Sequence, residues 1–195
     1  MDLLPFGVCI LFIYWIWRQQ CIFFLRYGLL DNTVSILNLA LLFFVLFYVY
    51  PLKFLMTWLL RYLYAVFTGS LSAELEQLAA MIPMDKLPHL MIIYGSGFVC
   101  IWLCLYFMYG HALRKNLQLE LDHIELYETR YSRNEMLYLV LTGAFSVILA
   151  ILSVLFNFPL GAALAGWAYH AIWIIHIIQA RKRKKQLAQL LAYQS

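Results

Sequence analysis

Residues 32–52 read NTVSILNLALLFFVLFYVYPL, an apolar run without a formal charge. A helix of about 20 such residues spans the roughly 30 Å hydrocarbon core of a bilayer. Asp31 precedes the run, Asn38 is the strongly polar side chain well inside it, and Pro51 is expected to end the spanning helix. At that depth a polar side chain usually finds a partner within the protein. The stretch therefore predicts a central span at 32–50, with Asp31 and Asn38 as helix-packing or pore candidates.

The overall composition points to the same class of protein. Hydrophobic residues make up 65% of the 195 residues and charged residues 12%, against about 45–50% and 25% in soluble domains. A soluble fold of this length lacks the interior to bury so much apolar surface. The net charge of +4 does not indicate direct nucleic-acid binding, because the basic residues cluster beside apolar segments. We expect an all-α integral membrane protein, a helical bundle of 4–5 transmembrane helices.

The remaining segments complete this bundle. Residues 52–67 are expected to run along the membrane interface, with one long tilted helix as the alternative. The charged connector at 111–135 is expected to be a cytoplasmic amphipathic helix, and 181–195 a basic cytoplasmic tail after a transmembrane domain at 1–180. Further spans are predicted at about 3–25, 90–110, 136–156 and 160–180, the last two separated by Asn157-Phe-Pro159.

The basic residues predict the orientation, because Lys and Arg gather on the cytoplasmic side of a membrane. Arg18 and Arg26 follow the first span, four basic residues fill the connector and five begin the tail, whereas the opposite side holds Lys53, Arg61 and Lys86. This pattern predicts five spans in a bacterial inner membrane, with the N-terminus outside and the C-terminus in the cytoplasm. A four-span protein whose first segment lies in the interface is the alternative.

Polar side chains on the last two spans are further candidates. Thr142, Ser146 and Ser153 lie on one face of a helix, as small polar residues do at helix contacts or, less often, along a pore. His170 and His176 are six residues apart, so they point to different helix faces and do not form a metal pair. They are expected to form hydrogen bonds between packed helices, with a proton relay or a ligand site as the alternative.

Motifs of enzymatic chemistry are absent from the sequence. It has no phosphate-binding glycine loop, nucleophile elbow or paired intramembrane carboxylates, so we expect neither an enzyme nor a cofactor or metal site. The basic run contacts membrane lipids in the simplest interpretation and a cytoplasmic protein partner in the alternative. The run consists of Arg181, Lys182, Arg183, Lys184 and Lys185.

Part of the chain, over about residues 17–180, resembles the transmembrane protein 175 potassium channel family. The residues that carry the resemblance are Trp17, Arg18, Gln19, Gln20, Phe23, Phe24, Asp31, Leu37-Asn38-Leu39 and Tyr50-Pro51. The later order of elements is also similar: a span with small residues, a charged connector and a hairpin broken at Pro159. The resemblance implies a family-like helical scaffold and a homo-oligomer, either a dimer or a tetramer.

The chain also departs from that family's pattern. An Arg-x-x-x-Phe-Ser-Asp signature, which the family carries on its pore-lining first helix, does not occur in these residues, and the chain begins within what would be the second helix. Gln19 and Gln20 stand where the family has histidines. The resemblance therefore does not imply potassium selectivity.

Three functions follow as hypotheses, of which a small membrane enzyme acting on lipid ranks last because no acid, base or nucleophile set is present. The first is an oligomeric membrane sensor or anchor that recruits a cytoplasmic effector through 111–135 and 181–195, as in a bacterial stress or phage-defence system. The second is a permeation subunit similar to an ion channel. The length of the two cytoplasmic polar elements favours the first.

Overall fold

The described part of the chain is entirely helical in the computed structural model. The structure describes residues 3–70, 81–83, 86–156 and 160–170, and single residues further on: Ile172, Ile177, Gln179, Arg181, Arg183, Lys184 and Gln186. The helices are α1 (Leu3–Tyr27), α2 (Asn32–Thr68), α4 (Leu87–Arg114), α5 (His123–Leu155) and α6 (Leu160–Trp167). The expected break at Asn157-Phe-Pro159 lies outside the described residues, and the predicted span at 160–180 lies only partly within them.

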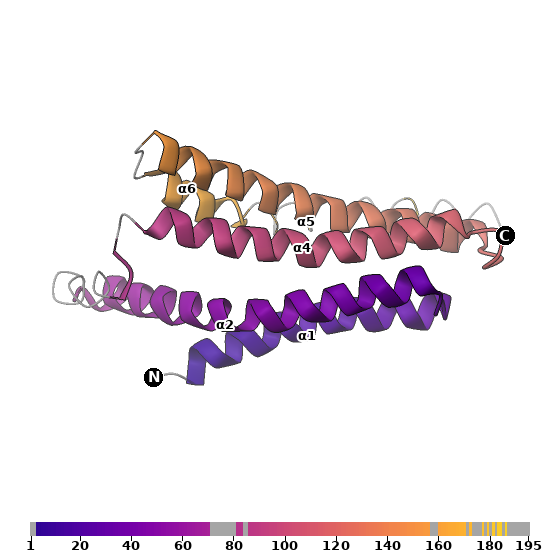
Figure 1. Ribbon diagram of the computed structural model, residues 1–195, viewed down its shortest axis with the longest axis horizontal. Coiled ribbons are helices and arrows are strands. Elements are labelled where there is room, and N and C mark those ends of the chain that lie inside the picture. The colour runs from indigo at the N-terminus through magenta and orange to yellow at the C-terminus, as the bar shows by residue number, and fades with distance from the viewer. Residues whose placement is uncertain are drawn as a thin grey trace.

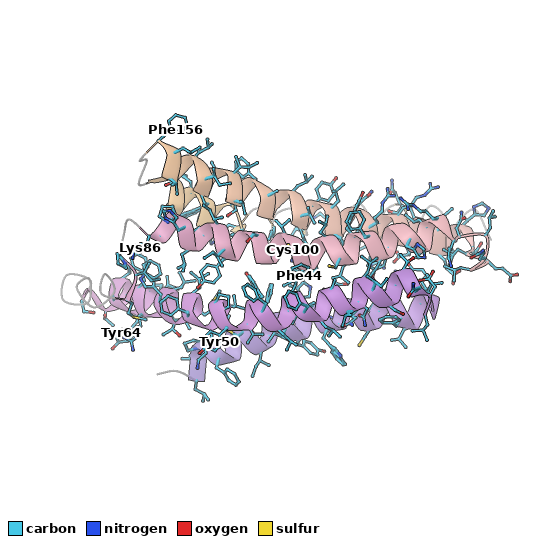
Figure 2. All side chains as sticks on the ribbon, in the orientation of Figure 1. Phe44, Tyr50, Tyr64, Lys86, Cys100 and Phe156 are labelled. Carbon is cyan, nitrogen blue, oxygen red and sulfur yellow. The ribbon has the colours of Figure 1, made fainter. Side chains whose placement is uncertain are left out.

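The helices form two layers, α1 with α2 and α4 with α5 and α6 (Figure 1). Aromatic side chains fill the interface between the layers, and Trp102, Tyr109 and Phe23 are fully buried there. Figure 2 shows side chains between α2 and α4, with Phe44 and Cys100 labelled in that space. Burial between the layers therefore holds together helices that are far apart in the sequence.

Four of the described helices, α1, α2, α4 and α5, are long and apolar enough to cross a membrane. With 25 residues in α1 and 37 in α2, a rise of about 1.5 Å per residue gives lengths of about 37 and 55 Å. Their outward sides are apolar; Tyr50, for example, is 87% exposed and Phe156 75% (Figure 2). The predicted fold class, an all-helical membrane bundle, is confirmed.

The prediction that Pro51 ends the spanning helix is wrong. Pro51 lies inside α2. The helix starts at the N-cap Asp31 and ends at Gly69, whose φ of 70° is the left-handed conformation that glycine adopts readily. A proline removes one backbone donor, yet the helix continues because residues beyond it, such as Leu52 and Ala65, are buried in the bundle. One long helix, the alternative to an interfacial helix at 52–67, is the arrangement found.

The charged connector at 111–135 does not form a helix of its own. Its first residues belong to α4, a turn follows at 115–122, and α5 then runs without interruption into the apolar segment. Asp122 and Glu125 form a capping box at the start of α5, and no proline follows before Leu155 to stop the helix. Charged residues at the start of α5 are therefore rigidly joined to the candidate span.

Glycines allow α4 and α5 to approach closely. A Cβ placed on Gly143 of α5 would lie 2.8 Å from both Phe98 Cδ1 and Val99 Cγ2 of α4. A Cβ on Gly95 of α4 would in turn collide with Val147 of α5. Small residues at both positions are what permits this contact.

Candidate functional site

The ion pairs between described residues lie at one end of the bundle. This end contains the turn between α1 and α2, at residues 28–31, and the turn between α4 and α5, at 115–122 (Figure 1). Three groups of contacts lie there: the Asp31 cluster, the Asn38 pair and the Glu128 cluster, each defined below by its residues.

The Asp31 cluster joins the start of α2 to the end of α4. One carboxylate oxygen of Asp31 accepts a hydrogen bond from the Val34 backbone N–H at 2.9 Å, as an N-cap does. The other oxygen lies 2.8 Å from Lys115 Nζ and 2.5 Å from His111 Nε2. Lys115, followed by the Val34 N–H and His111, lowers the pKa of Asp31 well below its ordinary value. The carboxylate thus pairs helix ends that are distant in the sequence.

Asp31→Asn is expected to reduce the acid sensitivity of the protein. The lowered pKa means that the carboxylate stabilises the fold above its ordinary pKa of 3.8, and that this contribution is lost as the pH falls through the folded-state pKa. Asparagine retains the N-cap but not the charge. Thermal melts at pH 7 and pH 3 should show a smaller drop for the variant than for the parent. An equal drop in both proteins would show that Asp31 does not contribute.

The Asn38 pair connects α1 to α2. Gln20 Nε2 donates a hydrogen bond to Asn38 Oδ1, and both side chains are half-buried. The internal partner predicted for Asn38 is therefore Gln20 of the neighbouring helix α1. Position 20 is one of the two at which the transmembrane protein 175 family was expected to have histidine.

Asn38→Leu should weaken the packing of α1 on α2 by about 1 kcal/mol, because it leaves the Gln20 amide without its acceptor. Insertion into the membrane should be unaffected, since the helix becomes more apolar. Thermal melts of the purified protein and its yield in the membrane fraction measure the two effects. Ser35→Leu, at an exposed position of the same helix, is the control. Equal melting of both variants and the parent would make Asn38 incidental.

The Glu128 cluster joins α1, α5 and the C-terminal segment. Glu128 is 8% exposed, and its carboxylate accepts hydrogen bonds from Arg26 Nη2 at 3.3 Å and from Arg183 Nε at 2.7 Å. Arg183 Nη2 contacts the same carboxylate, and Arg26 Nη1 lies 3.5 Å from Ser132 Oγ. At the next residue of each helix, the hydroxyls of Tyr27 and Thr129 are 2.8 Å apart. A buried acid thus holds two arginines from opposite ends of the chain.

Glu128, Arg26 and Ser132 were not among the candidate site residues taken from the sequence, where Glu128 counted only as one charge of the connector; Arg183 was a candidate as part of the basic run. A signal was nevertheless present. Continuing the Thr142–Ser146 stripe backwards in helical steps leads to Ser132 and Glu128, on the face of α5 that is buried. An acid in phase with a buried face is a candidate for an internal ion pair.

The described residues of the basic run at 181–185 differ in their contacts. Arg183 packs against α5, and its guanidinium carbon lies 5.3 Å from the centre of the Tyr131 ring. Hydrogen bonding to Glu128 raises the pKa of Arg183. Arg181 and Lys184 are exposed. Lys182 and Lys185 lie outside the described residues.

The predicted stripe of α5 lies at helix contacts. Ser146 is fully buried, and its Oγ donates to the Ala165 carbonyl oxygen of α6 at 2.8 Å. Thr142 Oγ1 donates to the Tyr138 carbonyl of its own helix at 2.8 Å, and Ser153 is 3% exposed. These side chains face the neighbouring helices within the chain.

Of the two histidine candidates, the structure describes one. His170 is exposed and its ring lies 5.1 Å from that of Trp167, whereas His176 lies outside the described residues. Among the residues that the structure describes, no group of three or more His, Cys, Asp or Glu side chains could hold a metal ion.

Comparison with known proteins finds similarity to potassium channels, although no protein-family model matches the chain. The chain is 34% identical over 190 residues to a protein of Marivirga tractuosa described as a potassium channel, and the match covers 97% of this chain and 76% of that protein. A crystal structure of a threonine-to-alanine variant of the potassium channel MtTMEM175, in complex with a nanobody–MBP fusion protein, superposes with a TM-score of 0.80 and 34% identity. It covers 94% of this chain and 78% of the other.

A bundle of long apolar helices with its polar contacts at one end defines a polytopic integral membrane protein. With this identity over nearly its whole length, the chain belongs to the transmembrane protein 175 (TMEM175) potassium channel family. Membership in a channel family implies an oligomeric membrane protein and agrees with the expectation that the chain is not an enzyme.

The comparisons also correct the favoured function. The hypothesis of a sensor or anchor for a cytoplasmic effector is wrong, because the relatives over 97% and 94% of the chain are potassium channels. Residues of the two polar elements that favoured this hypothesis instead make contacts within the chain. Most of the connector belongs to α4 and α5, and Arg183 of the tail is paired with Glu128. The alternative hypothesis, a permeation subunit, agrees with the comparisons.

Proposed function

We propose that the chain is a subunit of a potassium-permeable channel in a bacterial plasma membrane. The observation that carries this proposal is the 34% identity with a potassium channel of Marivirga tractuosa over 97% of the chain. The similar fold of MtTMEM175, with a TM-score of 0.80, also supports it.

The matched region leaves about a quarter of the Marivirga protein without a counterpart in these residues. We infer that this part includes the pore-lining first helix, because the Arg-x-x-x-Phe-Ser-Asp signature does not occur in the 195 residues. We propose that the described helices enclose a permeation path by themselves in an oligomer, and that they also form the scaffold that supports it. Glu128 and Asp31, which join helix ends within one chain, fit such a supporting role.

For the topology, we propose five spans with the C-terminus in the cytoplasm. The end of the bundle with the Asp31 and Glu128 clusters also has Arg114 and Arg130. An excess of Lys and Arg marks the cytoplasmic side. We further propose a dimer or a tetramer, to be distinguished by light scattering of the purified protein with the detergent contribution subtracted.

A flux assay tests the channel function. The purified chain is reconstituted into liposomes loaded with potassium, and potassium efflux into a sodium buffer is followed. The measurement is repeated with sodium in place of potassium inside the liposomes. We expect potassium efflux above that of liposomes containing an unrelated helical membrane protein at the same protein-to-lipid ratio. Potassium efflux no faster than in this control would contradict the proposal.

A further inference from the structure

The described residues of the C-terminal segment, from Leu160 to Gln186, lie antiparallel to α5 in a register that three contacts define. Ser146 of α5 bonds to Ala165, Glu128 to Arg183, and the Tyr127 hydroxyl to Gln186 Oε1 at 2.5 Å. As the residue number falls along α5, that of its partner rises by a similar amount. The described residues between Ile177 and Gln186 therefore lie beside the charged start of α5, near the membrane boundary.

Within this segment the side chains are sorted into two faces. Arg183 and Gln186 reach α5 through Glu128 and Tyr127. Ile177, Arg181 and Lys184 are exposed, and their spacing of four and three residues places them on one side of a helix. The exposed side thus begins with an apolar residue and continues, one and two turns further, with two cations.

The neighbouring face of α5 shows where the membrane surface lies. Its exposed residues follow one another at helical spacing and change from polar to apolar: Arg130, Asn134, Tyr138, Leu141, Phe145, Ile148 and Leu152. Tyrosine typically marks the headgroup level in such a series. By the antiparallel register, Arg181 lies level with Arg130, about 12 Å beyond Tyr138 at 1.5 Å per residue, and Ile177 lies level with Asn134.

Helix direction decides which of these cations approach the headgroups. Long side chains on a helix lean towards its N-terminus. The C-terminal segment runs away from the membrane, so Arg181 and Lys184 lean back towards it. On α5, which runs into the membrane, Arg130 leans away. Within the described residues, no acidic side chain forms an ion pair with Arg181 or Lys184, so both positive charges are available to a ligand.

We propose that Arg181 and Lys184, beside Ile177, form a binding site for the headgroup of an anionic phospholipid. The two cations can both donate hydrogen bonds to the oxygens of a lipid phosphate, Ile177 adds an apolar side chain one turn nearer the membrane, and Glu128 fixes the orientation by holding Arg183 on the opposite face. Cations near an anionic leaflet each strengthen its binding roughly fivefold. The test of this site does not depend on conduction.

Native mass spectrometry of the purified full chain, with phosphatidylglycerol or phosphatidylcholine added to the detergent micelles, tests this site. We expect the parent to bind more phosphatidylglycerol than phosphatidylcholine, and R181Q/K184Q to lower phosphatidylglycerol binding by roughly an order of magnitude. The matched control is R114Q/R130Q, which removes two exposed cations from the same end and should keep the preference.

Three outcomes would overturn the proposal: no preference for phosphatidylglycerol in the parent, an unchanged preference in R181Q/K184Q, or an equal loss in R114Q/R130Q. Glycerol 3-phosphate carries the anion without acyl chains and should not displace the bound lipid; complete displacement by it would reject a lipid site in favour of a free phosphate. Size-exclusion profiles identical to that of the parent show that the variants are folded, since both replaced side chains are exposed.

Discussion

Gly143→Val should destabilise the bundle by about 3 kcal/mol, because it overpacks the contact between α4 and α5. A Cβ at this position would lie 2.8 Å from side-chain atoms of Phe98 and Val99, and valine adds two methyl groups. Phe98 cannot easily move aside, since its ring packs 5.2 Å from that of Tyr169 and 5.9 Å from that of Trp102. A melt followed with a thiol-reactive dye measures the loss, because unfolding exposes Cys9 and Cys104, which are buried in the fold.

Gly110→Val is the control for this prediction. Gly110 also lies inside a helix, but a Cβ there would have no atom within 4 Å. Valine should therefore change the melting temperature little, since it is a better helix former than glycine and meets no neighbour. Equal destabilisation by the two variants would show that the glycines matter for helix propensity rather than for the close approach of α4 and α5.

The spans could be predicted from the sequence because hydrophobic length is a local property. A run such as 32–52 is apolar over enough residues to cross a bilayer, whatever surrounds it. The effect of Pro51 was wrongly predicted because a proline inside a helix loses one hydrogen bond, and whether the helix continues depends on the packing of residues beyond it. The extent of α5 was missed in a similar way, since the charge pattern at 111–135 indicates exposure and not where a helix is interrupted.

Only part of the candidate site could be predicted from the sequence. Asp31 and Asn38 could be selected because each is a polar residue beside or within an apolar run. Their partners, His111, Lys115 and Gln20, could not be, because the pairing depends on which helices are neighbours and at what register. Glu128 is the clearest case, since its two arginines lie at the opposite ends of the chain.

Glu128→Gln should lower stability by about 2 kcal/mol, because it leaves two arginines facing a neutral amide. The effect falls below the roughly 3–5 kcal/mol typical of a broken buried pair, since the side chains of Arg26 and Arg183 are 35% and 42% exposed and can be partly hydrated. The melt with the thiol-reactive dye measures it. Glu120→Gln, an exposed acid at the same end of the bundle, should leave the melting temperature unchanged.

A double-mutant cycle shows whether Glu128 acts through the C-terminal segment. Arg183→Gln alone removes one of the two arginines that donate to the Glu128 carboxylate and releases the C-terminal segment from α5. In the double variant, Glu128→Gln therefore has one ion pair fewer to break. The double variant should therefore lose less stability than the sum of the two single variants. Limited proteolysis should cut the C-terminal segment sooner in either single variant than in the parent. Additive losses would mean that Arg26 alone stabilises Glu128 and that the segment is held on α5 by other contacts, such as the bond between Ser146 and Ala165.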